Sequence, residues 1–244
     1  MRYCTLETAA TTKFTASPAS HAERAHTGGM RLAHFKHSCL LAELNGTRIL
    51  FDPGVFSHGF EGLTGLDAIF ITHQHPDHVD NARLPALIEG NPDAALYADP
   101  QTAAQLGDPW TAVHAGNIFG VGNVQVTGGG GRHAVIHPEL PVIDNTVYLL
   151  GTPDNPAQLV HPGDSLWVPP VPVDVLAIPA VAPWMKVSEA VDYLRAVHPR
   201  LAVPIHQEVA SEGGRGIYYS RLAEMAHEGT EFQVLTEEDD TEVA

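Results

Sequence analysis

Three imidazoles and a carboxylate occur within six residues of this sequence, directly after an apolar run at 68–71. These residues are His73, His75, Asp77 and His78. Imidazole nitrogens and carboxylate oxygens are the ligands that Zn²⁺ and similar divalent ions prefer. A polar turn that happens to be rich in histidine is the alternative interpretation. Four ligand-type side chains at this spacing, after a strand-like run, favour a metal site instead.

The spacing of these residues predicts two metal ions. Side chains alternate along an extended segment, so His73 and His75 point the same way and can bind one ion. Pro76 then bends the chain, which lets Asp77 and His78 face a second ion a few ångströms away. The residues alone therefore indicate a dinuclear centre.

The pattern His73-x-His75-x-Asp77-His78 resembles the HxHxDH signature of the metallo-β-lactamase fold superfamily. The resemblance implies a four-layer αββα sandwich and further ligands later in the chain. It assigns His133, after a run of four glycines, to the first metal ion, with His137 as a competitor for that role. The remaining implied ligands are Asp164 in Gly-Asp-Ser, as the bridging carboxylate, and His206 in Pro-x-His, on the second ion.

Four other residues are expected close to this centre. The resemblance implies that Asp52, in Asp-Pro-Gly, supports the ligand loop, although an ordinary turn is an equal alternative. His37, in His-Ser, is expected near the ligands or as a structural histidine. Lys186 and Trp184 are candidates for holding an anionic group and lining the pocket, with a solvated lysine and a packed tryptophan as alternatives.

His161-Pro-Gly-Asp-Ser and Val203-Pro-Ile-His resemble the ascorbate-6-phosphate lactonase-like branch of the superfamily. That resemblance implies a hydrolase acting on an ester, lactone or phosphodiester bond of a small molecule. Two divalent ions, Zn²⁺ or else Mn²⁺, would lower the pKa of a shared water from 15.7 to about 7. The resulting hydroxide would attack the substrate, and Asp77 would orient this nucleophile or pass on a proton. An iron-dependent oxidoreductase and a non-catalytic metal-binding protein are the alternatives.

Composition narrows the partners. The 244 residues carry 13 Lys and Arg against 29 Asp and Glu, a net charge of −16. So acidic a surface repels phosphate backbones and argues against nucleic acid as a partner. The sequence has no apolar run long enough to predict a membrane span. Two cysteines are too few for a disulfide framework, which fits a cytoplasmic protein, and a homo-oligomer is plausible on general grounds.

The elements that must position the ligands alternate as in an α/β protein. Strands are expected at 31–35, 39–44, 48–51, 68–71, 94–98, 124–127, 145–150, 173–179 and 201–206. Helices are expected at 83–88, at 101–106, and after Ser188 as an N-cap. Such alternation is typical of an αββα sandwich. One domain is predicted at 30–236, after a disordered extension at 1–29 and before a solvated acidic tail at 237–244.

Overall fold

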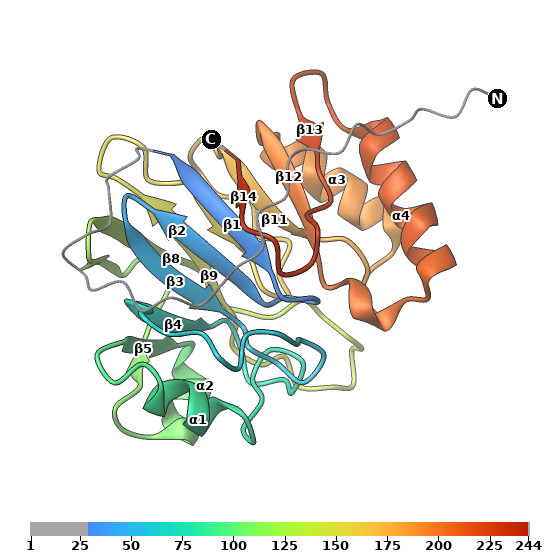
Figure 1. Ribbon diagram of the computed structural model, residues 1–244. Coiled ribbons are helices and arrows are strands. Elements are labelled where there is room, and N and C mark those ends of the chain that lie inside the picture. The colour runs from blue at the N-terminus through green and yellow to red at the C-terminus, as the bar shows by residue number, and fades with distance from the viewer. Residues whose placement is uncertain (1–28, 244) are drawn as a thin grey trace.

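The computed structural model describes residues 29–243 (Figure 1). The extension predicted at 1–29 lies outside these residues, apart from Gly29. The first strand begins at Met30. Among the described residues, no helix combines the length and the apolar character needed to cross a membrane.

Two seven-stranded mixed sheets form the centre of the molecule. The first sheet has the order β14-β1-β2-β3-β4-β5-β6, from strands Thr241–Glu242, Met30–His34, Leu40–Leu44, Thr47–Phe51, Ala68–Ile71, Ala95–Ala98 and Thr111–Ala112. The second has the order β13-β12-β11-β10-β9-β8-β7, from strands Glu231–Phe232, Leu201–Ile205, Val175–Pro179, Leu159–His161, Thr146–Gly151, Val124–Gly130 and Ile118–Val121.

Helices cover the outer faces of the two sheets. The helices are α1 (Leu84–Glu89), α2 (Pro100–Leu106), α3 (Val187–Val197) and α4 (Glu212–Met225), with a 3₁₀ turn η1 at Gln207–Val209. In Figure 1, α1 and α2 lie below the first sheet, whereas α3 and α4 lie beside the second. This arrangement is the predicted four-layer αββα sandwich.

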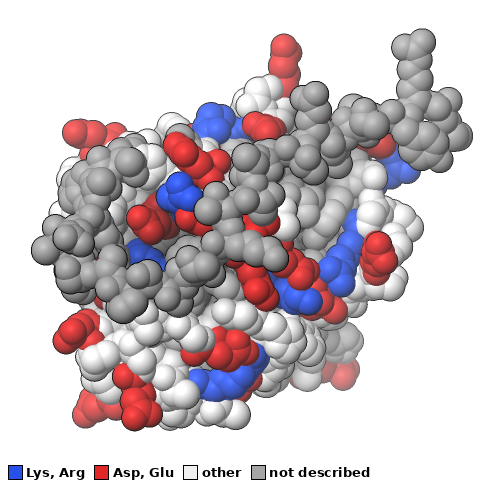
Figure 2. Space-filling model, viewed as in Figure 1, with Lys and Arg blue, Asp and Glu red and all other residues white. Residues whose placement is uncertain are grey.

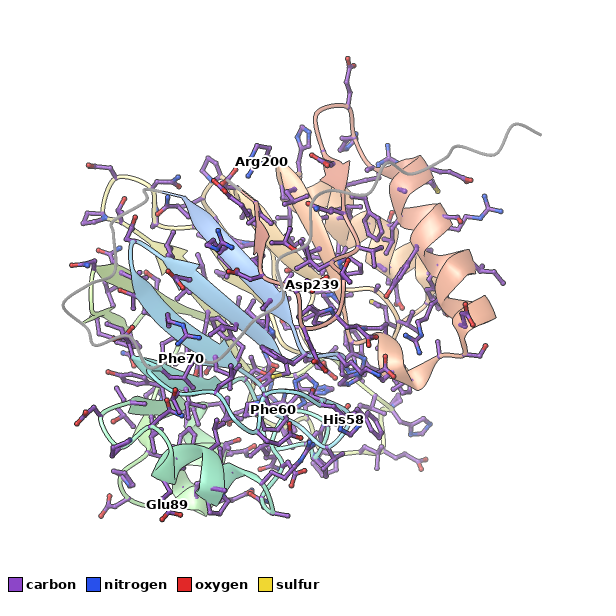
Figure 3. The ribbon with its side chains drawn as sticks, in the orientation of Figure 1. His58, Phe60, Phe70, Glu89, Arg200 and Asp239 are labelled. Atoms are coloured by element: carbon purple, nitrogen blue, oxygen red, sulfur yellow. The ribbon has the colours of Figure 1, made fainter. Side chains whose placement is uncertain are left out.

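Alternation of side chains along the strands explains the layers. Phe51 and Phe70 are fully buried between the two sheets, where their rings meet Tyr148 at centroid distances of 6.0 and 4.6 Å. The preceding residues of the same strands, Leu50 and Ile69, point outward into a separate core beneath α1 and α2. Phe60, from the loop after β3, belongs to that outer core (Figure 3). Strands buried on both faces carry apolar residues at every position, as the run at 68–71 does.

The predicted hairpin at Asn45-Gly46 is present. Leu44 pairs with Thr47, and both turn residues have a positive φ, of 52° and 75°. A two-residue turn of this kind needs φ above zero at both positions, which Asn and Gly tolerate best. The turn therefore fixes the register of β2 against β3.

Two local predictions were wrong. Lys186, not Ser188, is the N-cap of α3, and its backbone N–H donates to Glu189 Oε2 at 2.6 Å. The end of the chain is also more ordered than a solvated tail. Thr241–Glu242 pairs with β1 as strand β14, and Val243 is buried. Edge pairing gave this acidic segment a place in the first sheet that its composition did not indicate.

Candidate metal centre

The candidate ligands lie where strands of both sheets end. His73 follows β4, His133 follows β8, Asp164 follows β10 and His206 follows β12. Parallel pairing of β3 with β4, of β10 with β11 and of β11 with β12 brings these strand ends to one edge of the sandwich. A site at the carboxyl ends of parallel strands is a recurring consequence of this kind of topology.

Two clusters of ligand-type side chains meet at this edge. In each cluster, one donor atom from every residue lies within 4.8 Å of the donor atoms of the others. The first cluster consists of His73, His75, His133 and Asp164, and the second of His37, Asp77, His78 and His206. Both clusters therefore hold nitrogen and oxygen donors of the types that divalent ions bind.

Asp164 connects the clusters, because each of its carboxylate oxygens faces imidazoles. Oδ1 lies 3.2 Å from Nε2 of His78 and 3.2 Å from Nε2 of His206. Oδ2 lies 3.2 Å from Nε2 of His133 and 4.0 Å from Nε2 of His73. This carboxylate is buried, and it is positioned to contact an ion in either cluster.

In His78, His133 and His206, the three imidazoles at 3.2 Å from Asp164, the other ring nitrogen has a fixed acceptor. Nδ1 of His78 donates to Asp52 Oδ2 at 2.7 Å, that of His133 to the carbonyl oxygen of Ala134 at 2.6 Å, and that of His206 to a backbone carbonyl at 2.7 Å. A neutral imidazole whose Nδ1 carries the proton presents a lone pair at Nε2. Three lone pairs therefore point at the Asp164 carboxylate.

This convergence is the test of whether the residues fit a metal ion. His78 Nε2, His133 Nε2, His206 Nε2 and Asp164 Oδ1 are all buried without a hydrogen-bond partner among the described residues. Buried polar atoms of this kind need a partner. Lone pairs facing a carboxylate at 3.2 Å repel unless positive charge lies between them. The donor set therefore fits divalent ions.

The pKa directions point to the same need for positive charge. Burial opposes protonation of His78, but the charges of Asp164 and Asp52 outweigh it and raise the pKa of His78 well above its ordinary value. The pKa of His206 is raised in the same way, against burial, by Asp164. Burial would raise the pKa of Asp164, yet His206 and His78 hold it well below its usual range. Without a metal ion, protons supply the positive charge here.

His73 and His75 complete the first cluster, with His73 buried and His75 half-buried. Their facing nitrogens, His73 Nε2 and His75 Nδ1, are 3.0 Å apart. His73 Nδ1 lies 3.1 Å from the hydroxyl oxygen of Thr72, which in turn donates to Asp52 at 2.7 Å. Burial lowers the pKa of His73 well below its ordinary value, so its ring is neutral and available as a donor.

Asp52 is hydrogen-bonded to the segment that carries the candidate ligands. Its carboxylate is fully buried, and it accepts hydrogen bonds from the backbone N–H and the hydroxyl of Thr72 and from His78 Nδ1, each at 2.7 Å. A carboxylate that holds Nδ1–H of a histidine fixes both the tautomer and the direction of the ring. Thr72, which links Asp52 to His73, was not singled out from the sequence.

His37 contacts the second cluster directly. Its Nε2 lies 3.0 Å from Asp77 Oδ2, and its Nδ1 accepts the backbone N–H of Glu208 at 3.3 Å. Because Nδ1 accepts, the neutral ring carries its proton on Nε2 and donates it to Asp77. Burial lowers the pKa of His37 to about 4, against the hydrogen bond to Asp77, so the ring is neutral. This tautomer favours the supporting role over direct ligation.

The other predicted residues are divided by the structure. The indole N–H of Trp184 donates to Asp164 Oδ2 at 2.7 Å, and its ring lies 5.9 Å from that of His133. Lys186 is exposed at the start of α3 and has no recorded contact with either cluster. His137 is also exposed and belongs to neither cluster, whereas His133 belongs to the first.

Asn145 has a part in the site that the sequence pattern did not indicate. Its side-chain oxygen accepts the backbone N–H of Asp164 at 2.9 Å, and its amide donates to the carbonyl of Pro162, also at 2.9 Å. Gly163 between them has a φ of 57°, and an added Cβ would lie 2.5 Å from Asn145 Oδ1. Asn145 thereby fixes the turn that presents Asp164. From the sequence pattern, Asn145 was expected only as the first residue of a strand.

The chain has close and distant relatives of known sequence. Protein Rv0786c of Mycobacterium tuberculosis is 65% identical over 209 residues, which cover 86% of this chain and 98% of the relative. A UPF0173 metal-dependent hydrolase of Opitutus terrae is 29% identical over 196 residues, covering 72% of this chain and 84% of the relative.

Solved structures share the fold. Igni18, a metallo hydrolase from Ignicoccus hospitalis, has a TM-score of 0.67 at 16% identity and covers 88% of this chain and 98% of its own. CmlA, a diiron β-hydroxylase from Streptomyces venezuelae, has a TM-score of 0.65 at 15% identity and covers 88% of this chain and 54% of its own. At these identities, the likeness concerns the fold alone.

The match to a family model covers the whole candidate site. The model described as "Beta-lactamase superfamily domain" matches residues 31–206, from the first strand to the last histidine of the second cluster. The sandwich and the two histidine–aspartate clusters agree with that match. The chain therefore belongs to the β-lactamase superfamily, and it has the metallo-β-lactamase fold with two clusters able to hold metal ions.

Proposed function

We propose that this protein is a dinuclear metal-dependent hydrolase of a small molecule with an ester, lactone or phosphodiester bond. In this proposal His73, His75 and His133 hold one ion, and Asp77, His78 and His206 hold the other. Asp164 would contact both ions. Zn²⁺ is the first candidate and Mn²⁺ the second, because nitrogen and oxygen donors suit both.

One observation carries the proposal. Three imidazole Nε2 atoms face the Asp164 carboxylate at 3.2 Å, and their Nδ1 protons are all committed elsewhere. Positive charge is needed between these atoms, and bound divalent ions would supply it. Two divalent ions bound there would polarise the scissile bond and lower the pKa of a nearby water toward about 7.

The protein's own contribution falls mainly to Asp77. It is the more open of the two clustered carboxylates, with 20% of its side chain exposed against 3% for Asp164. Burial alone would raise the pKa of Asp77, but the hydrogen bond from His37 and the nearby imidazoles outweigh it and lower the pKa below its ordinary value. An ionised Asp77 accepts a proton from the attacking water or orients it.

Hydrolysis by metal-loaded protein tests the proposal. The protein is stripped with chelator, reloaded with Zn²⁺, Mn²⁺ or Fe²⁺, and assayed against aryl esters, lactones and bis-aryl phosphodiesters. We expect turnover with Zn²⁺ or Mn²⁺ that chelator abolishes and added metal restores. Oxygen consumption with the iron-loaded protein, and no hydrolysis with any ion, would instead favour an oxidoreductase on this fold. If neither hydrolysis nor oxygen consumption is observed, the result would favour a non-catalytic metal-binding protein.

A further inference from the structure

Exposed apolar side chains recur in the segments of the chain that carry the candidate ligands. Seven of the eleven large apolar side chains that are exposed among residues 29–243 follow a residue of the two clusters or its supporting loop. They are Val55, Phe56, Val135, Ile136, Leu140, Val168 and Val209. Single exposed apolar residues are ordinary on a protein surface, but a group gathered around a candidate site marks a binding surface.

One part of this group is fixed against the second cluster. Phe56, with an exposed fraction of 44%, packs edge-on against the ring of His37 at a centroid distance of 5.3 Å. The backbone N–H of Val55 donates to the carbonyl of Pro76 at 2.9 Å, which ties this loop to the segment carrying Asp77. The side chains of Val55 and Phe56 are thus held beside the cluster, and they remain open to solvent.

Another part borders the first cluster. Ala134, next to His133, donates its backbone N–H to the carbonyl of Asp164 at 2.7 Å. Val135 and Ile136 follow directly, with exposed fractions of 57% and 45%. Trp184 adds a half-buried indole whose ring lies 5.9 Å from that of His133. Apolar surface therefore adjoins both clusters.

The cations near the clusters are mostly engaged. Lys36 pairs with Glu237 at 3.3 Å, Arg215 with Glu208 at 3.0 Å, and Arg83 with Asp80 at 2.6 Å. On the face drawn in Figure 2, basic side chains lie singly among acidic ones. Arg132 and Lys186 are exposed, and no ion pair is recorded for either among the described residues. They are the exposed cationic side chains on the cluster segments to which an anionic substrate could bind.

We infer that the site takes an uncharged ester or lactone with a bulky apolar substituent; this inference rests on the hydrolase function proposed above. The substituent packs against Phe56 or Val135–Ile136 while the carbonyl carbon faces the clusters. Water adds its oxygen to that carbon, the carbon–oxygen bond to the alcohol breaks, and the departing oxygen takes up a proton. The products are a carboxylic acid and an alcohol, or one hydroxy acid from a lactone.

A series of uncharged p-nitrophenyl esters of increasing acyl length tests the inference, beside γ-lactones with the same chains and the anion bis-p-nitrophenyl phosphate. Each CH₂ group that is buried should raise kcat/KM about threefold to fourfold. In Phe56→Ala and Ile136→Ala, the ratio of kcat/KM for the octanoyl ester to that for the acetyl ester should fall about tenfold. Ile217→Ala is the matched control, because Ile217 is 66% exposed on α4, away from the cluster segments.

Three outcomes would overturn the inference while leaving hydrolysis in place. The first is kcat/KM that does not change with acyl length. The second is a preference for the phosphodiester that is lost in Arg132→Gln or Lys186→Gln. The third is a change of sedimentation coefficient in Phe56→Ala and Ile136→Ala with an unchanged length ratio, which would make the apolar group a contact between copies of the chain. Absence of all hydrolysis by the metal-loaded protein would instead contradict the proposed function.

Discussion

The carboxylate of Asp164 faces three imidazole nitrogens and an indole N–H at once, and it is buried. Its two oxygens are turned toward different clusters, so in the proposed centre this one side chain would contact both ions. An amide in its place would keep the shape, but it would lose the charge that balances two divalent cations. Asp164 is therefore the most sensitive position of the proposed site.

Asp164→Asn is expected to lower metal content from about two ions per chain to one or none, and kcat/KM by about 10³-fold or more, because several kcal/mol of charge stabilisation are lost. Plasma mass spectrometry and the ester assay measure these effects. Asp154→Asn makes the same substitution at an exposed loop position and should change neither. Full metal content in Asp164→Asn would contradict the bridging role.

Trp184→Phe removes the indole donor and keeps an aromatic ring beside the clusters. Because a hydrogen bond to a ligating carboxylate fixes its orientation, we expect metal affinity to fall about tenfold. Competition with a chromophoric chelator measures the affinity. The indole also serves as a reporter, so quenching of tryptophan fluorescence by Co²⁺ should shrink in this variant. Unchanged affinity would reduce Trp184 to a packing residue.

Metal uptake is expected to release protons, because the pKa values of His78 and His206 are raised in the metal-free protein. The affinity for metal should therefore increase as the pH rises toward these values. Titration calorimetry in two buffers of different ionisation enthalpy measures the protons released. Binding enthalpies that agree between the two buffers would contradict the expectation.

The same groups give the metal-free protein an opposite dependence on pH. A histidine whose pKa is raised on folding adds stability that is complete below its unfolded pKa of about 6.5 and is lost as the pH rises through the folded value. Chelator-treated protein should therefore lose stability above about pH 6.5, as measured by thermal unfolding. Metal-loaded protein should not show this loss.

At the scale of elements, the loop after β3 is packed tightly against the ligand loop. The backbone at Gly54 lies so close to Asp77 that an added Cβ would meet its carbonyl oxygen at 1.9 Å. Arg83 reinforces the packing by donating to the carbonyl oxygens of Gly54 and Ser57, each at 2.7 Å. The loop after β3 thus packs directly against the segment that carries Asp77 and His78.

Gly54→Ala must therefore displace the segment that carries Asp77 and His78, and we expect it to lose the ion of the second cluster while the first is kept. Metal content per chain and circular dichroism measure the effect. Gly62→Ala is the matched control, since nothing lies within 4 Å of its added Cβ and its φ is not positive. Two ions per chain in Gly54→Ala would show that the loop yields without cost to the site.

Features set by neighbouring residues could be predicted from the sequence, whereas contacts between distant residues could not. The hairpin at Asn45-Gly46 and the grouping of His73 to His78 follow from neighbouring residues. In contrast, His37 reaches Asp77 across 40 positions, and Asn145 reaches Asp164 across 19. Those contacts depend on how the two sheets align at one edge. Nothing in the local pattern carries that information. The superfamily resemblance implied the ligands, Asp52 and the sandwich, but not the contact of Asn145.

For the whole molecule, the position of the site follows from the contact between the two sheets. The turn after β1 belongs to the first sheet and is bound by residues of the second. Nε2 of His161 lies 2.9 Å from the carbonyl oxygen of Ser38, and the backbone N–H of His206 donates to the carbonyl oxygen of His37 at 2.9 Å. Ligands from one sheet are thereby positioned against ligands from the other. Binding of metal across this junction should stabilise the whole fold.

Metal content per chain is the most direct test of the account. The protein is purified without chelator or nickel resin, and its metals are measured by plasma mass spectrometry together with protein concentration. We expect about two Zn²⁺ or Mn²⁺ ions per chain, as for other two-metal sites. His73→Ala should lose an ion, whereas His137→Ala should keep both. Folded protein without tightly bound metal, which also fails to take up Zn²⁺ or Mn²⁺ on addition, would contradict the central claim.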